Sequence, residues 1–390
     1  MFTKLDFAKL KERRSAMWKL LIVLLLTLAA RAEEHPVMPI GSSAPAFALP
    51  GVDGKTHRLS DYASSPVLVI VFTCNHCPIA QMYEQRIQQL AADYKGKGVA
   101  VIAVQPNDPK AIRIDELDSS DLSDSLAEMK IRVEYKHLTY PYLYDGDAQE
   151  LARALGPKAT PHVFIFDEQR RLRYEGRIDN SYRTELVKTH EARDAIDALL
   201  AHKEVAVTHT GVFGCSTKWS EKSADRAATL EKIDAQPVTV ALTSKTDLAK
   251  LRTNPSHQMM LVDFWATWCG SCIAEFADLQ DLLRMYADRD FSLVTVSANM
   301  PDEQAGVLRF LEKKHATSTN LLFDSDDTEA HQTAFDPKWD SAVPYTVLLS
   351  SEGKVLYKKL GPVDLLELRR IILANVPAEY VGFNRYWQSP

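Results

Sequence analysis

The sequence predicts an α/β protein built from two tandem copies of one architecture, each a central mixed sheet flanked by helices. The chain has 390 residues, more than the ~100 to 200 residues of a typical domain. Both halves repeat the same order of apolar strand and amphipathic helix patterns. In both halves this repeat contains a pair of cysteines separated by two residues. These observations together favour two sandwiches of sheet and helices.

The first copy begins with the apolar run VLVIVFT (67–73), which predicts a buried strand followed by a helix that ends near Gly96 and Gly98. VAVIAV (99–104) predicts the next strand. TPHVFIFDEQRRLRYEGRI (160–178) then predicts an antiparallel hairpin. The apolar spacing of DAIDALLAHK (194–203) predicts a closing helix, so we expect the first domain to cover residues 41–203.

The second copy repeats this order after a polar, alanine-containing connection over residues 204–236. LVDFWAT (261–267) predicts a strand, a helix follows it, and FSLVTVS (291–297) predicts the next strand. VPYTVLLSSEGKVLYKKLG (343–361) predicts a second hairpin. We therefore expect the second domain to cover residues 237–380.

Composition and charge limit the class of protein. A hydrophobic fraction of 46% and a charged fraction of 25% are typical of a soluble globular chain. The formal charge of -6, with no long basic run beyond the N-terminus, argues against a nucleic-acid partner. The acidic stretch DELDSSDLSD (115–124) is expected to be a solvated surface insertion.

The N-terminus has the plan of a signal peptide. Basic residues precede LLIVLLLTLAA (20–30), which is shorter than the ~20 residues needed to cross a bilayer. Ala30-Arg31-Ala32 fits a cleavage site, so residues 1–32 are expected to be removed during export, with the periplasm as the destination. The alternative is an uncleaved segment that anchors the chain to the membrane. Exported cysteines can form disulfides, and five cysteines leave one thiol without a pair.

The two cysteine pairs, Cys74/Cys77 and Cys269/Cys272, have the spacing of one helical turn, which suits a reversible disulfide. The positive end of the helix dipole would stabilise the leading thiolate and lower its pKa. Pro78 is tolerated in a first turn, so the first helix is expected to begin near Cys74. Cys74 and Cys269 would then attack a disulfide, and Cys77 and Cys272 would resolve the mixed disulfide.

The residues inside the two pairs differ in charge. His76 lies within the first pair and, when protonated, favours the thiolate, which makes that disulfide the better oxidant. Gly270 and Ser271 in the second pair carry no charge. The difference predicts that electrons pass from the second pair to the first.

The segment VDFWATWCGSC (262–272) resembles the active-site signature of the thioredoxin superfamily, particularly its exported thiol-disulfide reductases. The resemblance covers roughly residues 238–376. It implies that Asp263 is a buried acid that helps to deprotonate the resolving cysteine. It also implies a catalytic role for Glu275, three residues after Cys272.

The first half is similar to the redoxin group related to alkyl hydroperoxide reductases, through APAFALPGVDG, FTCNHCP, YPYLYD, TPHVFIFD and GCSTKW. The match departs from the family's pattern in three respects. Leu68, six residues before Cys74 as Asp263 is before Cys269, occupies the position of the buried acid, and no tryptophan precedes Cys74. Thr73 lies four residues before Cys77, where peroxiredoxins place a threonine three residues before the attacking cysteine.

The resemblance also implies a cis-proline beside each cysteine pair. The peptide bonds concerned are Thr160-Pro161 and Val343-Pro344. If the resemblance holds, Thr160 and Val343 would pair with the substrate backbone as an added strand.

These observations predict an exported thiol-disulfide oxidoreductase that needs no cofactor or metal and acts between protein disulfides and an upstream thiol reductant. A first alternative is a thiol peroxidase, an antioxidant whose first domain is recharged by the second. A second is a copper-delivery protein that uses Cys74 and Cys77 with His76 or His162. Cys215 is either a spare thiol or a resolving, relay cysteine.

Overall fold

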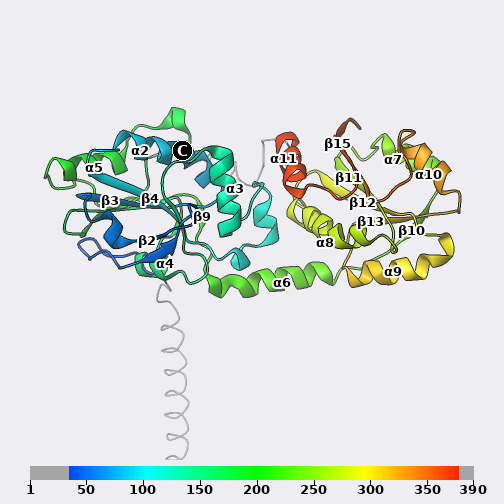
Figure 1. Ribbon diagram of the computed structural model, residues 1–390, viewed down its shortest axis with the longest axis horizontal. Coiled ribbons are helices and arrows are strands. Elements are labelled where there is room, and N and C mark those ends of the chain that lie inside the picture. The colour runs from blue at the N-terminus through cyan, green and yellow to red at the C-terminus, as the bar shows by residue number, and fades with distance from the viewer. Residues whose placement is uncertain (1–34, 377–390) are drawn as a thin grey trace, which may run out of the picture.

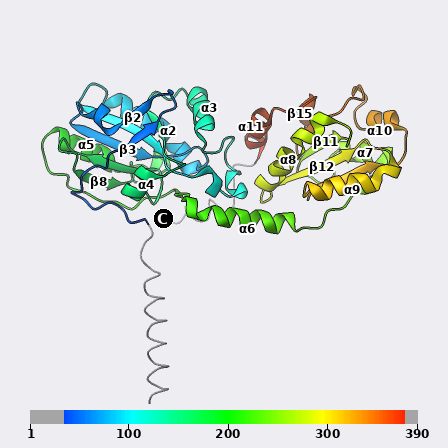
Figure 2. The ribbon, with the colours of Figure 1, turned by 60° about the horizontal axis from the view of Figure 1, so that its bottom comes forward.

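The computed structural model describes residues 35–376 and contains a large mixed sheet in each half of the chain. Figures 1 and 2 show the halves as two lobes joined by α6 (Ser223–Asp234), a helix with no buried residue. The predicted signal peptide over residues 1–32 lies outside the described residues. Between residues 35 and 376, no helix has the length and apolar character needed to cross a bilayer.

The N-terminal sheet has five strands in the order β5-β4-β3-β7-β8. The first three of these run parallel, and β7 and β8 form the predicted antiparallel hairpin. All six residues of β3 are buried, as expected for a central strand covered on both faces. The strands are β3 (Val67–Phe72), β4 (Val99–Gln105), β5 (Tyr142–Tyr144), β7 (His162–Phe166) and β8 (Leu172–Gly176).

Helices and two small ladders surround this sheet. The helices are α2 (Pro78–Asp93), α3 (Leu126–Lys136), α4 (Glu150–Leu155) and α5 (Glu191–Leu200), with short 3-10 turns η1 (Leu59–Tyr62), η2 (Pro109–Ala111), η3 (Ile114–Leu117), η4 (Thr184–Leu186) and η5 (Ser220–Lys222). The ladders pair β1 (Ala48–Pro50) with β2 (Thr56–Arg58) and β6 (Ala159–Thr160) with β9 (Cys215–Ser216).

The C-terminal sheet has six strands in the order β10-β13-β12-β11-β14-β15, again with a parallel part and a closing antiparallel hairpin. Its strands are β10 (Ala241–Thr243), β11 (Met259–Trp265), β12 (Phe291–Ser297), β13 (Thr319–Phe323), β14 (Tyr345–Leu349) and β15 (Val355–Leu360). Its helices are α7 (Lys245–Arg252), α8 (Gly270–Met285), α9 (Gln304–Lys313), α10 (Thr328–Phe335) and α11 (Leu365–Asn375), with η6 (Pro301–Glu303) before α9. The predicted repeat of elements is therefore confirmed.

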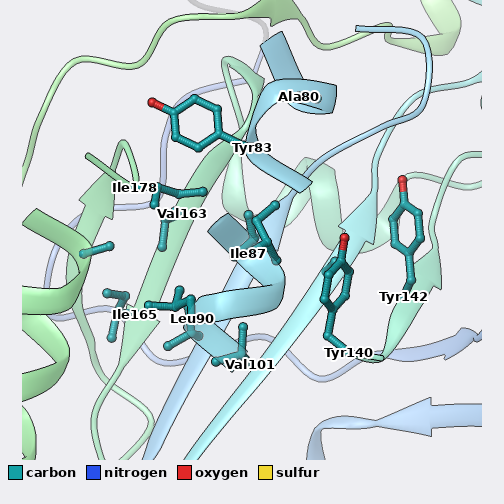
Figure 3. Packing of buried hydrophobic residues seen from close by; sticks show 14 of the residues in the cluster. Ala80, Tyr83, Ile87, Leu90, Val101, Tyr140, Tyr142, Val163, Ile165 and Ile178 are labelled. Atoms are coloured by element: carbon teal, nitrogen blue, oxygen red, sulfur yellow. The ribbon is translucent and has the colours of Figure 1, made fainter. Parts of the chain in front are cut away.

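The alternating side chains of β3 supply a core to both faces of the N-terminal sheet. Val67, Val69 and Val71 belong to the cluster under α2, and the intervening residues belong to the cluster on the opposite face. Figure 3 shows Tyr83, Ile87 and Leu90 of α2 within the first cluster. This packing fixes α2, and with it the cysteine loop that precedes the helix.

The segment after α5 packs on the N-terminal sheet. His209 forms a parallel bridge with Glu175 of β8, β9 pairs with β6, and Trp219 is buried with its ring stacked on His35. We therefore propose that the N-terminal domain extends to Trp219, beyond the boundary at Lys203 that the sequence suggests. The connection between the domains is then α6 and its flanking residues.

The acidic stretch 115–124 lies between the two domains, and the expectation that it is a solvated insertion is wrong. Asp118 pairs with Arg289 at 3.0 Å, Asp121 pairs with Arg370 at 2.8 Å, and both arginines belong to the C-terminal domain. Asp124 is fully buried. The partners of these carboxylates are distant in sequence, so the local charge pattern alone could not reveal them.

Candidate redox sites

In the C-terminal domain, Cys269 and Cys272 form a disulfide with an S–S distance of 2.04 Å. Cys269 is the N-cap residue of α8, and its sulfur accepts a hydrogen bond from the backbone N–H of Cys272 at 3.2 Å. The side chain of Cys272 is buried, and Cys269 is slightly more exposed. The pair thus lies on the first turn of a helix, where the sequence spacing predicts it.

A cis peptide bond faces this disulfide. Val343-Pro344 is cis, which confirms the expectation drawn from the resemblance. The sulfur of Cys269 lies 3.6 Å from the carbonyl oxygen of Val343. Among the described strands, none pairs with Val343, because β14 begins two residues later at Tyr345. The backbone beside this disulfide is therefore open to an added strand.

Two buried acids lie on β11 and α8, the strand before the disulfide and the helix that carries Cys272. Asp263 is buried in β11 and accepts a hydrogen bond from the Thr346 hydroxyl at 2.9 Å. Burial raises the pKa of Asp263 to about 7, and the nearby Glu275 carboxylate adds to the rise. Burial also raises the pKa of Glu275, although its oxygen accepts a hydrogen bond from Val363 N–H. A carboxyl group that titrates near neutral pH is suited to proton transfer.

In the N-terminal domain, α2 begins at Pro78 and Cys77 is its N-cap residue. The expectation that this helix begins near Cys74 is therefore wrong. A proline disfavours the helical conformation in the residue before it, and Cys77 is extended, with φ -74° and ψ 118°. Pro78 thus fixes the start of the helix, and Cys74 lies in the loop that precedes it.

This shift makes Cys77, rather than Cys74, the counterpart of Cys269. Thr160-Pro161 is the second cis peptide bond, as expected, and the Cys77 sulfur lies 3.3 Å from the Thr160 carbonyl oxygen. The same relation joins Cys269 to Val343. We therefore propose that Cys77, in place of Cys74, is the attacking residue.

The shift also moves the counterparts of the other site residues. Val71 pairs with Val163, two residues after the cis-proline, just as Asp263 pairs with Thr346. Val71, and not Leu68, therefore occupies the position of the buried acid. By the same register, Ala80 stands where the C-terminal domain has Cys272.

Two further thiols surround the Cys77 sulfur. Burial alone would raise the pKa of Cys77, but the Cys215 and Cys74 thiols and the His76 charge hold it well below the usual thiol value. The backbone N–H of Cys215 also donates to this sulfur at 3.2 Å. Cys74 and Cys77 are buried, and Cys215 is partly exposed. Cys77 is therefore the thiolate of a three-cysteine cluster.

His76 owes its charge to Asp124, a residue that the sequence did not single out. The His76 Nδ1 lies 2.6 Å from the Asp124 carboxylate, which also accepts the backbone N–H groups of Asn75 and His76. Burial favours neutral His76, but Asp124 offsets this effect and raises the pKa of His76. The one local signal in the sequence was the capping box that starts at Ser125, which places Asp124 directly before a helix.

A hydrogen-bonded chain connects Asp124 to the segment that carries Cys215. Asn107 donates to Asp124 at 2.8 Å, and its own side-chain oxygen accepts the Lys218 N–H at 2.8 Å. The same carboxylate therefore orients both the cysteine loop and the strand that faces it.

Among the described residues, one group of three side chains could share a metal ion: Cys74, His76 and Asp124, with ligand atoms within 4.8 Å of one another. His76 and Asp124 already neutralise each other, so we interpret this group as a buried ion pair beside a thiol. The other histidine considered for copper, His162, is buried and bonded to Glu175 at 2.8 Å and to Lys158 N–H. Its position gives no support to a copper role.

Two mixed sheets, each with a cysteine at a helix N-cap beside a cis-proline, define a tandem thioredoxin-like protein. The AhpC/TSA family model matches residues 40–175, and the Redoxin model matches residues 234–370. The thiol-disulfide oxidoreductase ResA of Geobacillus kaustophilus is 30% identical over 138 residues, which cover 35% of this chain and 67% of the relative. The chain therefore belongs to the thioredoxin-like redoxin family.

Two further similarities cover parts of the chain. The thiol:disulfide interchange protein DsbE of Allochromatium vinosum is 30% identical over 108 residues, 27% of this chain and 54% of the relative, so the match spans about half of that relative. The crystal structure of a hypothetical protein from Sinorhizobium meliloti 1021 is 31% identical, with 48% of this chain and 99% of that chain covered and a TM-score of 0.42.

The raised pKa of Asp263 predicts a pH-dependent stability. The folded protein keeps the proton on Asp263 up to about pH 7, whereas the unfolded chain loses it near 3.8. The contribution of Asp263 to the free energy of unfolding is thus complete below the pKa that Asp263 has in the unfolded chain, and it is lost as the pH rises towards 7. Asp263→Asn should remove this loss and stabilise the C-terminal domain by a few kcal/mol at pH 8, since one pKa unit corresponds to about 1.4 kcal/mol. Guanidinium unfolding at pH 4 and pH 8 measures the difference.

The same substitution should slow disulfide reduction and remove an inflection near pH 7 from the rate profile. Glu275→Gln is the matched variant, because removal of the neighbouring charge should move the inflection to lower pH. An unchanged profile in Asp263→Asn would contradict the proton-transfer role.

Asp124→Asn should raise the pKa of Cys77, because the neutral amide that replaces the carboxylate no longer holds the proton on His76. The change is measured from the thiolate absorbance near 240 nm of the reduced protein as a function of pH. At a pH well below the pKa of Cys77, each unit by which this pKa rises removes about nine-tenths of the thiolate. Asp115→Asn, on the same segment and paired with the exposed Arg113, is the control. Equal titrations in both variants would contradict the role of Asp124.

Proposed function

We propose that this protein is an exported thiol-disulfide oxidoreductase whose C-terminal domain exchanges disulfides with protein substrates at Cys269. The observation that carries the proposal is the Cys269–Cys272 disulfide at the start of α8, beside an unpaired backbone at Val343 and an acid with a pKa of about 7. Cys269 is the more exposed sulfur, so a substrate thiolate or disulfide would meet it first. The similarity to ResA and DsbE supports the same chemistry.

Export is supported by the basic and apolar N-terminal sequence and by a disulfide, which persists in oxidising compartments. The periplasm, by cleavage after Ala32 or by anchorage through the uncleaved segment, is the compartment that we propose. An upstream thiol reductant there would return the C-terminal pair to its reduced state.

The proposed relay from the C-terminal pair to the N-terminal cysteines needs movement of the domains or a diffusing thiol carrier. Cys269 caps one end of α8, whereas Arg289, just after the other end, contacts Asp118 of the N-terminal domain. The 16 residues of α8 span about 24 Å. Direct exchange between Cys269 and Cys77 therefore requires a rotation about the α6 connection.

Substitution of the C-terminal cysteines tests the proposal. Cys269→Ser should reduce turnover of a fluorescent disulfide peptide, with dithiothreitol as reductant, to the uncatalysed rate, because the attacking sulfur is lost. Cys272→Ala should accumulate a mixed disulfide between Cys269 and the peptide, visible by mass spectrometry. Cys77→Ser is the control and should leave this reaction unchanged. Loss of activity in Cys77→Ser together with full activity in Cys269→Ser would overturn the assignment.

A second candidate function, thiol peroxidase, is favoured by one observation in the N-terminal domain. Cys77 is a low-pKa thiolate at a helix N-cap, followed by Pro78, within the segment that matches the AhpC/TSA family. A hydroperoxide would oxidise the Cys77 thiolate to a sulfenic acid and leave as an alcohol or water.

Peroxide consumption distinguishes this candidate from disulfide exchange alone. With a dithiol reductant, the protein should consume hydrogen peroxide with saturable kinetics. Cys77→Ser should lose this activity, and Cys74→Ser should retain most of it, because Cys74 is not at the helix start. The absence of protein-dependent consumption in the unaltered chain would exclude the peroxidase function.

A further inference from the structure

Strand β9 occupies the place where a substrate strand is expected in the N-terminal domain. Cys215 pairs antiparallel with Thr160, directly before cis-Pro161, and Ser216 pairs with Ala159. In the C-terminal domain the matching backbone at Val343 has no strand partner among the described strands. In the N-terminal domain, a segment of the chain itself therefore occupies the strand position that is open in the C-terminal domain.

Gly214 is what allows this close approach. Its φ is +145°, and a Cβ atom at this position would lie 2.1 Å from the Thr160 carbonyl oxygen. Any other residue would push the segment away from the cis-proline. The order Gly214-Cys215 therefore places a thiol beside the Cys77 sulfur.

The residues after Cys215 anchor the strand. The Thr217 hydroxyl donates to Pro157 O at 2.6 Å, and Lys218 forms an ion pair with Glu116 at 2.6 Å. Lys218 N–H donates to Asn107, which is bonded to Asp124. The segment is held by the same network that positions His76, so Cys215 is part of the redox centre.

We propose that Cys77 and Cys215 form the redox pair of the N-terminal domain, with Cys215 as the resolving thiol. The Cys74 sulfur lies 3.1 Å from the Thr160 hydroxyl and is outside this pair. This inference deepens the proposed thiol-disulfide chemistry and rests on it. Cys215 lies in the strand register of a substrate cysteine, whereas Cys74 corresponds by position to Ala266 of the C-terminal domain. The spacing of Cys74 and Cys77 gives the appearance of a functional pair, but no helical turn separates them.

The proposed oxidation balances with a small disulfide as oxidant. The Cys77 thiolate attacks one sulfur of the small disulfide, forms a mixed disulfide and releases one thiolate. Cys215 loses its proton to that thiolate and attacks the Cys77 sulfur, which releases the second thiolate and leaves the Cys77–Cys215 disulfide. The protein loses two electrons and one proton, and the small disulfide becomes one thiol and one thiolate, which takes its proton from the solvent.

Reduction by a dithiol follows from the exposure of the two sulfurs. Cys215 is partly exposed and lines a pocket with His76 and Lys218, whereas Cys77 is buried. An incoming thiolate attacks Cys215, and Cys77 leaves as the thiolate. The second thiol of the donor then displaces Cys215, and the donor becomes a disulfide. Because β9 fills the strand position, we infer that this domain reacts with small oxidants and not with extended polypeptides.

Disulfide mapping of the full-length protein tests the proposal. The protein is reduced, treated with glutathione disulfide, alkylated and digested, and its peptides are identified by mass spectrometry. The expected product joins Cys77 to Cys215 both in the unaltered chain and in Cys74→Ser, and in the unaltered chain Cys74 is alkylated. A Cys74–Cys77 product with alkylated Cys215, or no disulfide within the N-terminal domain, would overturn it. The proposed function is tested separately, by detection of the Cys269–Cys272 disulfide in the same digest and by the rate at which the protein reduces the fluorescent disulfide peptide.

A pair of glycine variants tests the strand position without removal of any thiol. Gly214→Ala should displace Cys215 and allow the Cys77–glutathione adduct to accumulate, because resolution becomes slower. Gly211→Ala is the matched control, since a Cβ there meets no atom within 4 Å. Thermal unfolding of both variants establishes that they are folded. Equal resolution rates in two folded variants would contradict the proposed role of β9.

Discussion

Both domains depend on one constraint, which holds a cysteine sulfur at a helix N-cap against the carbonyl before a cis-proline. The sulfur-to-oxygen distances are 3.3 Å at Cys77 and 3.6 Å at Cys269. In each case the backbone N–H three residues later, of Ala80 or Cys272, points at the sulfur. The unpaired N–H groups and the dipole of the helix favour negative charge at that point. Sheet, helix and proline together therefore create a place for a thiolate.

The two domains differ in the source of the second thiol. In the C-terminal domain, Cys272 supplies it from the same helical turn. In the N-terminal domain the equivalent residue is Ala80, so a partner thiol must come from another part of the chain. Cys74 comes from the preceding loop and Cys215 from a strand more than a hundred residues away. One architecture thus supports a local disulfide in one copy and a long-range thiol contact in the other.

Much of the architecture was predictable from local pattern. The apolar runs predicted β3, β4, β11 and β12, both hairpins followed from their sequences, and the resemblance gave both cis-prolines. These features depend on residues that are close in sequence or on a family signature. The location of Cys269 and Cys272 on a first turn followed for the same reason.

The organisation of the N-terminal site was not predictable, because it depends on contacts distant in sequence. A two-residue spacing between cysteines suggested a helical pair, but the conformational effect of Pro78 on Cys77 moved the helix start by one turn. Asp124 lies in an acidic stretch that a charge pattern assigns to solvent, yet it carries the ion pair with His76. Cys215 lies in a segment that resembled a linker. In each case the three-dimensional partner decided the role of the residue.

The difference between an open and an occupied strand position implies a division of work. Under the proposed function, the unpaired backbone at Val343 would align an extended polypeptide before the disulfide exchange. In the N-terminal domain, β9 already occupies this strand position and holds the Cys215 thiol beside Cys77. The loss of conformational entropy needed to bring the two thiols together therefore occurs when the protein folds, and not during the reaction. Such a domain would react faster with its own thiol, but its strand position would be closed to other polypeptide strands. Under the proposal, electrons then enter and leave this domain through Cys215, which is partly exposed.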